Sequence, residues 1–206
     1  MKKFYVSLLT SLLLVGCGGG EGDNPPMPGP DVHYVTQTFN FINCSIHGTY
    51  DTDAKMTEFK EWFNNQESIT PLETFSCSGM VQIQALYGED SQYILSLGSQ
   101  KNTGEMNFEF KYALNSVTVT ARAYSKYNSY NQVWNIDSES KLYLDDNLID
   151  LSTSATTFDE MESISYTYDE YKETDEIKAL TLSTAEEGKR VFIESLTLEW
   201  RVPIEE

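Results

Sequence analysis

Short runs in which apolar and polar residues alternate fill the second half of the chain, and this pattern restricts the fold more than any other feature. Residues 81–87, 93–97, 106–110 and 117–123 are such runs, and a period of two is typical of strands with one buried face. Turn-forming Gly, Asn and Asp residues separate these runs. Short strands at this spacing predict an all-β fold, an antiparallel two-sheet β-sandwich, rather than a sheet of strand–helix–strand units.

One segment breaks the pattern and predicts a short helix. Residues 54–66 place four apolar residues at helical spacing: Met56, Phe59, Trp62 and Phe63. Asp53 stands where a capping residue is expected. The apolar side of this helix is expected to pack on the sandwich.

The last strand changes face partway along its length. Val191 and Ile193 are apolar at odd positions, whereas the apolar positions from Leu196 to Val202 are even. A slip of one residue within a continuous strand is the effect of a β-bulge, so the pattern predicts a bulge near Glu194 and Ser195.

The N-terminal residues have the organisation of an export signal. Lys2 and Lys3 precede an apolar run of 12 residues, Phe4 to Val15, whereas a membrane-spanning helix needs ~20 residues. The following residues complete Leu14-Val15-Gly16-Cys17, which resembles the lipobox of bacterial lipoproteins. The resemblance implies that residues 1–16 are a signal peptide and that Cys17 becomes a lipidated N-terminus.

The resemblance also implies a location and a domain order. Residues 17–31 would form the lipidated cysteine and a Gly/Pro-rich tether, and residues 32–206 a single β-sandwich domain. The protein is expected to be exported and held at the membrane by its lipid anchor. If the cell is Gram-negative, the outer membrane is expected, because Gly18 is not the aspartate that commonly retains such lipoproteins in the inner membrane.

Charge restricts the partners of the exported chain. The net charge is −18, and loss of the signal peptide removes two more basic residues, Lys2 and Lys3. Such a chain repels phosphates, which excludes nucleic acid and anionic lipid headgroups as direct partners. Solubility, a cationic partner and a divalent metal remain open as reasons for the acidity.

The cysteines that remain form an even pair. With Cys17 assigned to lipid, Cys44 and Cys77 are left in an oxidising compartment, which predicts a disulfide worth roughly 3–4 kcal/mol. Two buried free thiols are the alternative.

No catalytic, cofactor or metal motif is visible in the sequence. It contains neither a Gly-x-Ser-x-Gly elbow nor a His-Glu-x-x-His motif, and its two histidines both lie near the start of the expected domain. The aspartates near residues 51–53 and 145–150 do not have the spacing of a calcium loop. We therefore expect a protein that is not an enzyme, with no cofactor and no metal site.

The best candidates for ligand binding are four clustered aromatic residues. Tyr124, Tyr127, Tyr130 and Trp134 lie among Ser, Asn, Lys and Gln, and exposed rings with polar neighbours suit the recognition of a sugar or a protein. Tyr127 and Tyr130 are expected on an exposed loop between two strands. The alternative is that Tyr124 and Trp134 point into the core and leave two ordinary surface tyrosines.

Several stretches together resemble a known type of module. Residues 95–99, 108–110, 117–124, 180–182 and 189–200 are similar to the jelly-roll, carbohydrate-binding-like modules of bacterial surface lipoproteins and secreted enzymes. We therefore expect a lipid-anchored binding or adhesion module with an unknown glycan or protein ligand. A structural lipoprotein of an envelope complex, or an acidic inhibitor of a cationic enzyme, is the alternative.

Overall fold

Antiparallel strands make up most of the computed structural model, which describes residues 31–42, 44–66, 69–86, 93–173, 177–184 and 189–204. The chain divides into two units, residues 1–30 and 31–206, and all described residues belong to the second. Its elements are β1 (Val32–Asn40), β2 (Gly48–Thr49), α1 (Asp53–Asn64), β3 (Leu72–Gly79), β4 (Val81–Ala85), β5 (Tyr93–Leu97), β6 (Gly104–Phe110), β7 (Ala113–Ala123), β8 (Ser125–Asn128), β9 (Val133–Ile136), β10 (Lys141–Leu144), β11 (Asn147–Asp150), β12 (Ile164–Tyr168), a short 3-10 helix (Glu170–Glu173), β13 (Ala179–Thr184) and β14 (Val191–Pro203).

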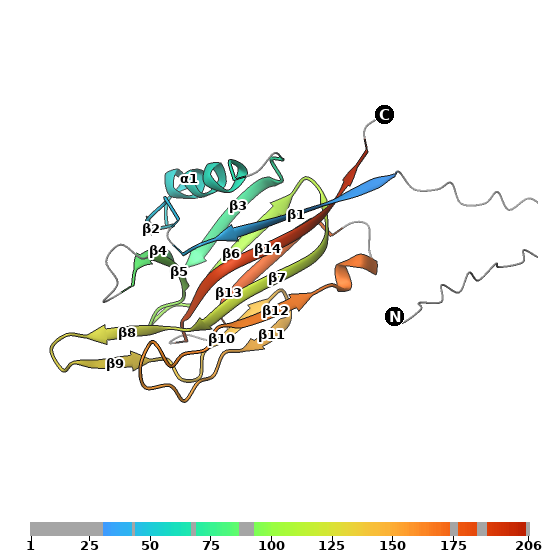
Figure 1. Ribbon diagram of the computed structural model, residues 1–206. Helices are drawn as coiled ribbons and strands as arrows, with labels where there is room; N and C mark the ends of the chain where they lie inside the picture. The colour runs from blue at the N-terminus through green and yellow to red at the C-terminus, as the bar shows by residue number, and fades with distance from the viewer. Residues whose placement is uncertain are drawn as a thin grey trace, which may run out of the picture. The chain divides into compact units, whose positions relative to one another are not determined.

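Two of the sheets pack against each other and confirm the predicted all-β sandwich. Sheet A has seven strands in the order β12-β7-β14-β5-β4-β2, with β1 also paired to β14. Sheet B has five strands in the order β11-β10-β13-β6-β3, and β8 and β9 form a separate two-stranded hairpin. Figure 1 shows β1, β14 and β7 side by side. Leu198 and Val119 of sheet A share one buried cluster with Phe108 and Leu182 of sheet B.

Strand β14 is the central strand of sheet A, and it contains the predicted bulge. It pairs with β7 on one edge, and on the other edge with β5 and then β1. Its register with β7 shifts between Ile193 and Ser195, and this shift confirms the bulge. As a result, Ile193 before the bulge and Leu196 after it are both fully buried.

Glycines allow the chain to cross between the two sheets. Strand β3 of sheet B leads into β4 of sheet A, and β5 of sheet A leads into β6 of sheet B. A Cβ atom on Gly104 would lie 2.3 Å from both the Gly98 nitrogen and the Met80 carbonyl oxygen. Gly79 has φ +68, a conformation that a side chain disfavours. The two crossings therefore pack backbone against backbone.

Helix α1 fills the space between one edge of each sheet, and the predicted helix is confirmed. Phe59 contacts Phe41 before the helix and Phe75 of β3, while Phe63 stacks on Phe39 of β1 with ring centroids 3.5 Å apart. The capping residue is Thr52 rather than Asp53, because the Thr52 hydroxyl accepts a hydrogen bond from the Lys55 nitrogen.

The predicted disulfide is wrong in this structure, where both cysteines are free thiols. Cys44 is buried, and its Sγ donates a hydrogen bond to the Ile46 carbonyl oxygen at 3.4 Å. Cys77 is half-buried in β3 opposite Met106, and burial raises the pKa of its thiol to about 12. Each thiol thus stays protonated at neutral pH and behaves as a small apolar group, which was the alternative left open by the sequence.

Candidate functional site

The four candidate aromatic residues separate into buried and exposed members. Tyr124 follows β7 and is 6 % exposed, with its ring against Phe192 and under the Arg190 guanidinium. Tyr127 lies in β8 rather than in the loop, and both it and Trp134 of β9 are half-buried. Tyr130 lies at the tip of the β8–β9 hairpin and is 94 % exposed. Of the two tyrosines expected on the loop, the structure places only Tyr130 there.

A ring that the sequence analysis did not single out completes an aromatic surface. Tyr127 and Trp134 face each other across the hairpin with edge-to-face rings 5.2 Å apart, and Trp134 stacks on Phe158 at 5.5 Å. We call Tyr127, Trp134 and Phe158 the aromatic rim. Phe158 is one aromatic residue within the polar segment 152–160, so no local periodicity marks it. Its role follows only from the contact with the hairpin.

The Arg122 guanidinium connects sheet A to the aromatic rim. The Arg122 guanidinium lies 4.1 Å from the centre of the Phe158 ring, and its Nε is 2.8 Å from the Glu194 carboxylate. Burial lowers the pKa of Arg122, while the charge of Glu194 opposes this shift. Ser163 donates a further hydrogen bond to Glu194 at 2.7 Å. The two opposite charges compensate each other at the boundary between the rim and the sheet.

The outer face of sheet A carries two rows of uncharged polar residues. Strand pairing aligns residues of β1, β14, β7 and β12, in that order: the first row is Thr38, Thr197, Thr118 and Thr167, and the second is Asn40, Ser195, Thr120 and Ser165. We call these eight residues the hydroxyl face. All eight side chains are half-exposed or exposed. The face has no formal charge in a chain whose net charge is −18.

Hydrogen bonds between neighbouring hydroxyls organise this face. The Thr38 and Thr197 hydroxyls are 2.9 Å apart, and the Thr118 and Thr167 hydroxyls are 2.8 Å apart. A third pair joins Thr120 and Ser165 at 2.8 Å. In each pair either hydroxyl can be the donor, and a hydroxyl that donates to its neighbour still has acceptor capacity for a ligand.

The hydroxyl face lies next to the aromatic rim. Arg122 follows Thr120 by two residues on the same side of β7, and Phe158 covers Arg122. Glu194 directly precedes Ser195 at the bulge of β14. A ligand lying along β7 would therefore reach both surfaces. The Thr-x-Thr and Ser-x-Thr patterns predict outward hydroxyls on single strands, but their alignment across four strands depends on tertiary pairing.

The described ranges hold no group of three or more His, Cys, Asp or Glu residues placed to bind a metal ion. In the same part of the chain, no helix is both long and apolar enough to cross a membrane. Cys17, the proposed lipid attachment point, lies outside the described residues.

None of the protein-family models matches the sequence, and a comparison with curated proteins found no match. A function for this chain therefore has to be inferred from its own residues.

Proposed function

We propose that the protein is a lipid-anchored, non-catalytic binding module of the bacterial cell envelope, and that its ligand is a neutral glycan held by the hydroxyl face and the aromatic rim. The observation that carries the proposal is the hydroxyl face itself. Eight uncharged side chains from four strands are aligned on one sheet of a strongly acidic protein.

The chemistry of this surface suits sugars. A sugar hydroxyl both donates and accepts hydrogen bonds, and so do Thr and Ser hydroxyls, while Asn40 adds an amide. Next to the face, the half-buried rings of Tyr127, Trp134 and Phe158 offer apolar edges and faces against which a sugar ring can pack. The uncharged face would not repel a neutral glycan. An anionic glycan would be repelled by the negative charge of the protein as a whole.

The length of the surface favours a chain of sugars over a single one. From Ser116 to Arg122, β7 spans about 20 Å at the rise of an extended strand. Glu199 bounds the face at the Ser116 end, and its carboxylate accepts hydrogen bonds from Thr36, Asn115 and Ser116. Both ends of the face therefore have their charges engaged by protein groups.

The binding proposal is tested by changing two central hydroxyls. Thr118→Val combined with Thr197→Val keeps the β-branched shape and removes two hydroxyls. Each lost hydrogen bond contributes about 1 kcal/mol, so affinity for a neutral glycan identified on an array should fall roughly thirtyfold by calorimetry.

The matched control is Thr181→Val, on the outer face of sheet B, where the Thr181 hydroxyl bonds Asn107. This variant should bind like the wild type. The proposal would be contradicted if the wild-type protein bound no neutral glycan on the array. It would also be contradicted if the double variant and the Thr181→Val control bound the glycan with equal affinity.

The anchor is tested separately through Cys17. A thiol carries the lipid in the proposed processing, so Cys17→Ser should release the protein from membranes or stall removal of residues 1–16. Membrane fractionation and the mass of the mature N-terminus measure this. A Cys17→Ser protein that still sediments with membranes like the wild type contradicts the anchor.

A further inference from the structure

Strand β3 is an edge strand whose open side faces helix α1. Among the described strands it is hydrogen-bonded only to β6, at the end of sheet B. An edge strand presents backbone N–H and C=O groups that another extended chain can pair with.

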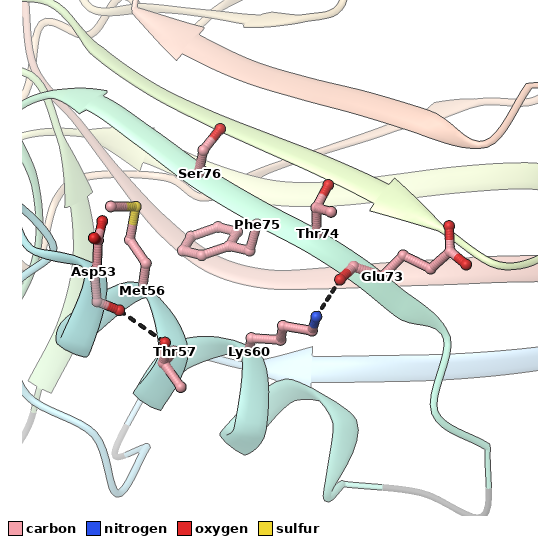
Figure 2. Close-up of a pocket in the computed structure, with 8 residues that line it drawn as sticks. All are labelled: Asp53, Met56, Thr57, Lys60, Glu73, Thr74, Phe75 and Ser76. Carbon is pink, nitrogen blue, oxygen red and sulfur yellow. Dashed lines mark hydrogen bonds between the residues drawn. The ribbon is translucent and has the colours of Figure 1, made fainter.

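Side chains of α1 pair with the first part of the edge. The Asn64 side-chain amide donates to the Leu72 carbonyl oxygen at 3.0 Å and accepts from the Leu72 nitrogen at 2.9 Å. One amide thus makes both bonds that a residue of a neighbouring strand would make. The Lys60 ammonium donates to the Glu73 carbonyl oxygen, as Figure 2 shows. This side of the edge therefore accepts strand-like partners.

A groove of about 370 Å³ lies between α1 and β3, and the residues of β3 that line it run from Glu73 to Ser76. In Figure 2, Met56 reaches from the helix and Phe75 from the strand into the space between them. Met56 is half-buried and Phe75 is 9 % exposed, which gives the groove an apolar floor. Thr74 and Ser76 flank Phe75 on the exposed strand.

We propose that this groove, between α1 and residues 73–76 of β3, binds an extended segment of a partner protein. The segment adds a strand to sheet B and sets one apolar side chain between Met56 and Phe75. A flexible thioether suits such a contact, since Met adapts to differently shaped side chains. Backbone pairing supplies affinity and the apolar floor supplies selectivity, as in other strand-addition complexes.

The charges that line the groove indicate which residues should flank the apolar side chain of the bound segment. Asp53 and Glu73 line the groove and are both exposed, and the only positive group among its lining residues, Lys60, already donates to the Glu73 carbonyl. In a chain of net charge −18, this favours a segment with basic residues on either side of its apolar centre. The inference does not rest on glycan binding, because the groove and the hydroxyl face belong to different sheets.

The test uses the nine-residue peptide KTVTLTVTK and the full protein carrying Cys17→Ser. The alternating sequence places Val and Leu on one face of an extended peptide, between basic ends. We expect saturable binding by fluorescence anisotropy and slower hydrogen exchange of the amides in residues 74–76. Two further peptides carry N-methyl groups on alternate residues, one on the odd and the other on the even positions. Each has lost the N–H donors along one of its two edges and cannot pair with a strand through that edge. At least one of the two methylated forms should lose tenfold or more in affinity, and a peptide with glutamates in place of lysines should also lose at least tenfold.

A protein variant tests the groove floor. Met56→Lys should weaken binding of the parent peptide at least tenfold, because it places a charge on the apolar floor and repels the basic ends. The matched control, Glu61→Gln, changes the net charge by the same unit at an exposed helix position outside the groove and should bind like the wild type. Thermal unfolding checks that both variants fold, and the methylated peptides test the inference on the wild type alone. Absence of binding by the parent peptide, binding of both methylated peptides as tightly as the parent, or unchanged binding by a folded Met56→Lys variant would overturn the inference.

Discussion

Two tyrosines three positions apart in the β8–β9 hairpin have different roles because their surroundings differ. Tyr130 lies at the tip, where the Asn128 side-chain oxygen accepts hydrogen bonds from the Tyr130 and Asn131 nitrogens. This turn orders the backbone and leaves the Tyr130 ring in water. Tyr127 instead packs on Trp134 of the neighbouring strand. The polar residues around both tyrosines do not reveal this difference in the sequence.

Single alanine substitutions should distinguish the two tyrosines. Tyr130→Ala should change the free energy of unfolding by less than about 0.5 kcal/mol, because the ring has little protein contact to lose. Tyr127→Ala should lower it by about 1–2 kcal/mol through loss of the aromatic pair and its buried area. Denaturant unfolding of each variant measures these values. A large destabilisation by Tyr130→Ala would show that the tip packs on the protein.

At the scale of elements, the crossings between sheets depend on the absence of side chains more than on turn propensity. The Met80 nitrogen donates to the Thr103 carbonyl oxygen at 2.9 Å, and the Gly98 nitrogen donates to the Met80 carbonyl oxygen at 2.8 Å. These bonds hold the β3–β4 and β5–β6 connections together. Gly104, the first residue of β6, packs against the backbone of both Met80 and Gly98.

Gly104→Ala should therefore be among the most damaging small substitutions in the chain. Its Cβ meets backbone atoms that cannot rotate away, so the strands have to separate at a cost of about 2–4 kcal/mol. Gly48→Ala is the comparison, because Gly48 has φ +115 but its Cβ would meet only the end of the Lys55 side chain, at 3.5 Å. It should cost about 1–2 kcal/mol from backbone strain alone. Equal losses of unfolding free energy would mean that the contact at Gly104 relaxes.

At the scale of the whole molecule, a strongly negative net charge coexists with an uncharged surface, the hydroxyl face. The chain is strongly acidic, yet the proposed glycan surface carries no formal charge. Of the charges nearest to this surface, Arg122 and Glu194 form an ion pair, and the Glu199 carboxylate is hydrogen-bonded to Thr36, Asn115 and Ser116. Long-range electrostatics should therefore contribute to solubility and to the choice of partners, but little to glycan affinity.

Salt dependence checks this separation. Between 0.05 and 0.5 M NaCl, affinity for a neutral glycan should change by less than about twofold, because no ionic contact is screened. Peptide binding at the groove between α1 and β3 should weaken over the same range, because it relies on opposite charges. Calorimetry at several salt concentrations measures both. Strongly salt-dependent glycan binding would place the ligand on the acidic surface instead.

Much of the fold could be predicted from local sequence because a period of two is a local property. Alternating residues marked the strands, helical spacing marked α1, and the change of parity after Ile193 marked the bulge that the structure contains. Each of these features depends on neighbours within a few residues, whose burial follows directly from the geometry of a strand or a helix.

The tertiary structure alone decided how distant residues meet. Thr38, Thr118 and Thr167 form one row only because β14 pairs with both β1 and β7, and β12 then pairs with β7. Phe158 joins the aromatic rim through contact with Trp134 of the hairpin, and the two cysteines remain free although their number suggested a bond. These outcomes depend on register and packing between segments far apart in sequence, and no local pattern encodes which of many possible pairings buries the most apolar surface.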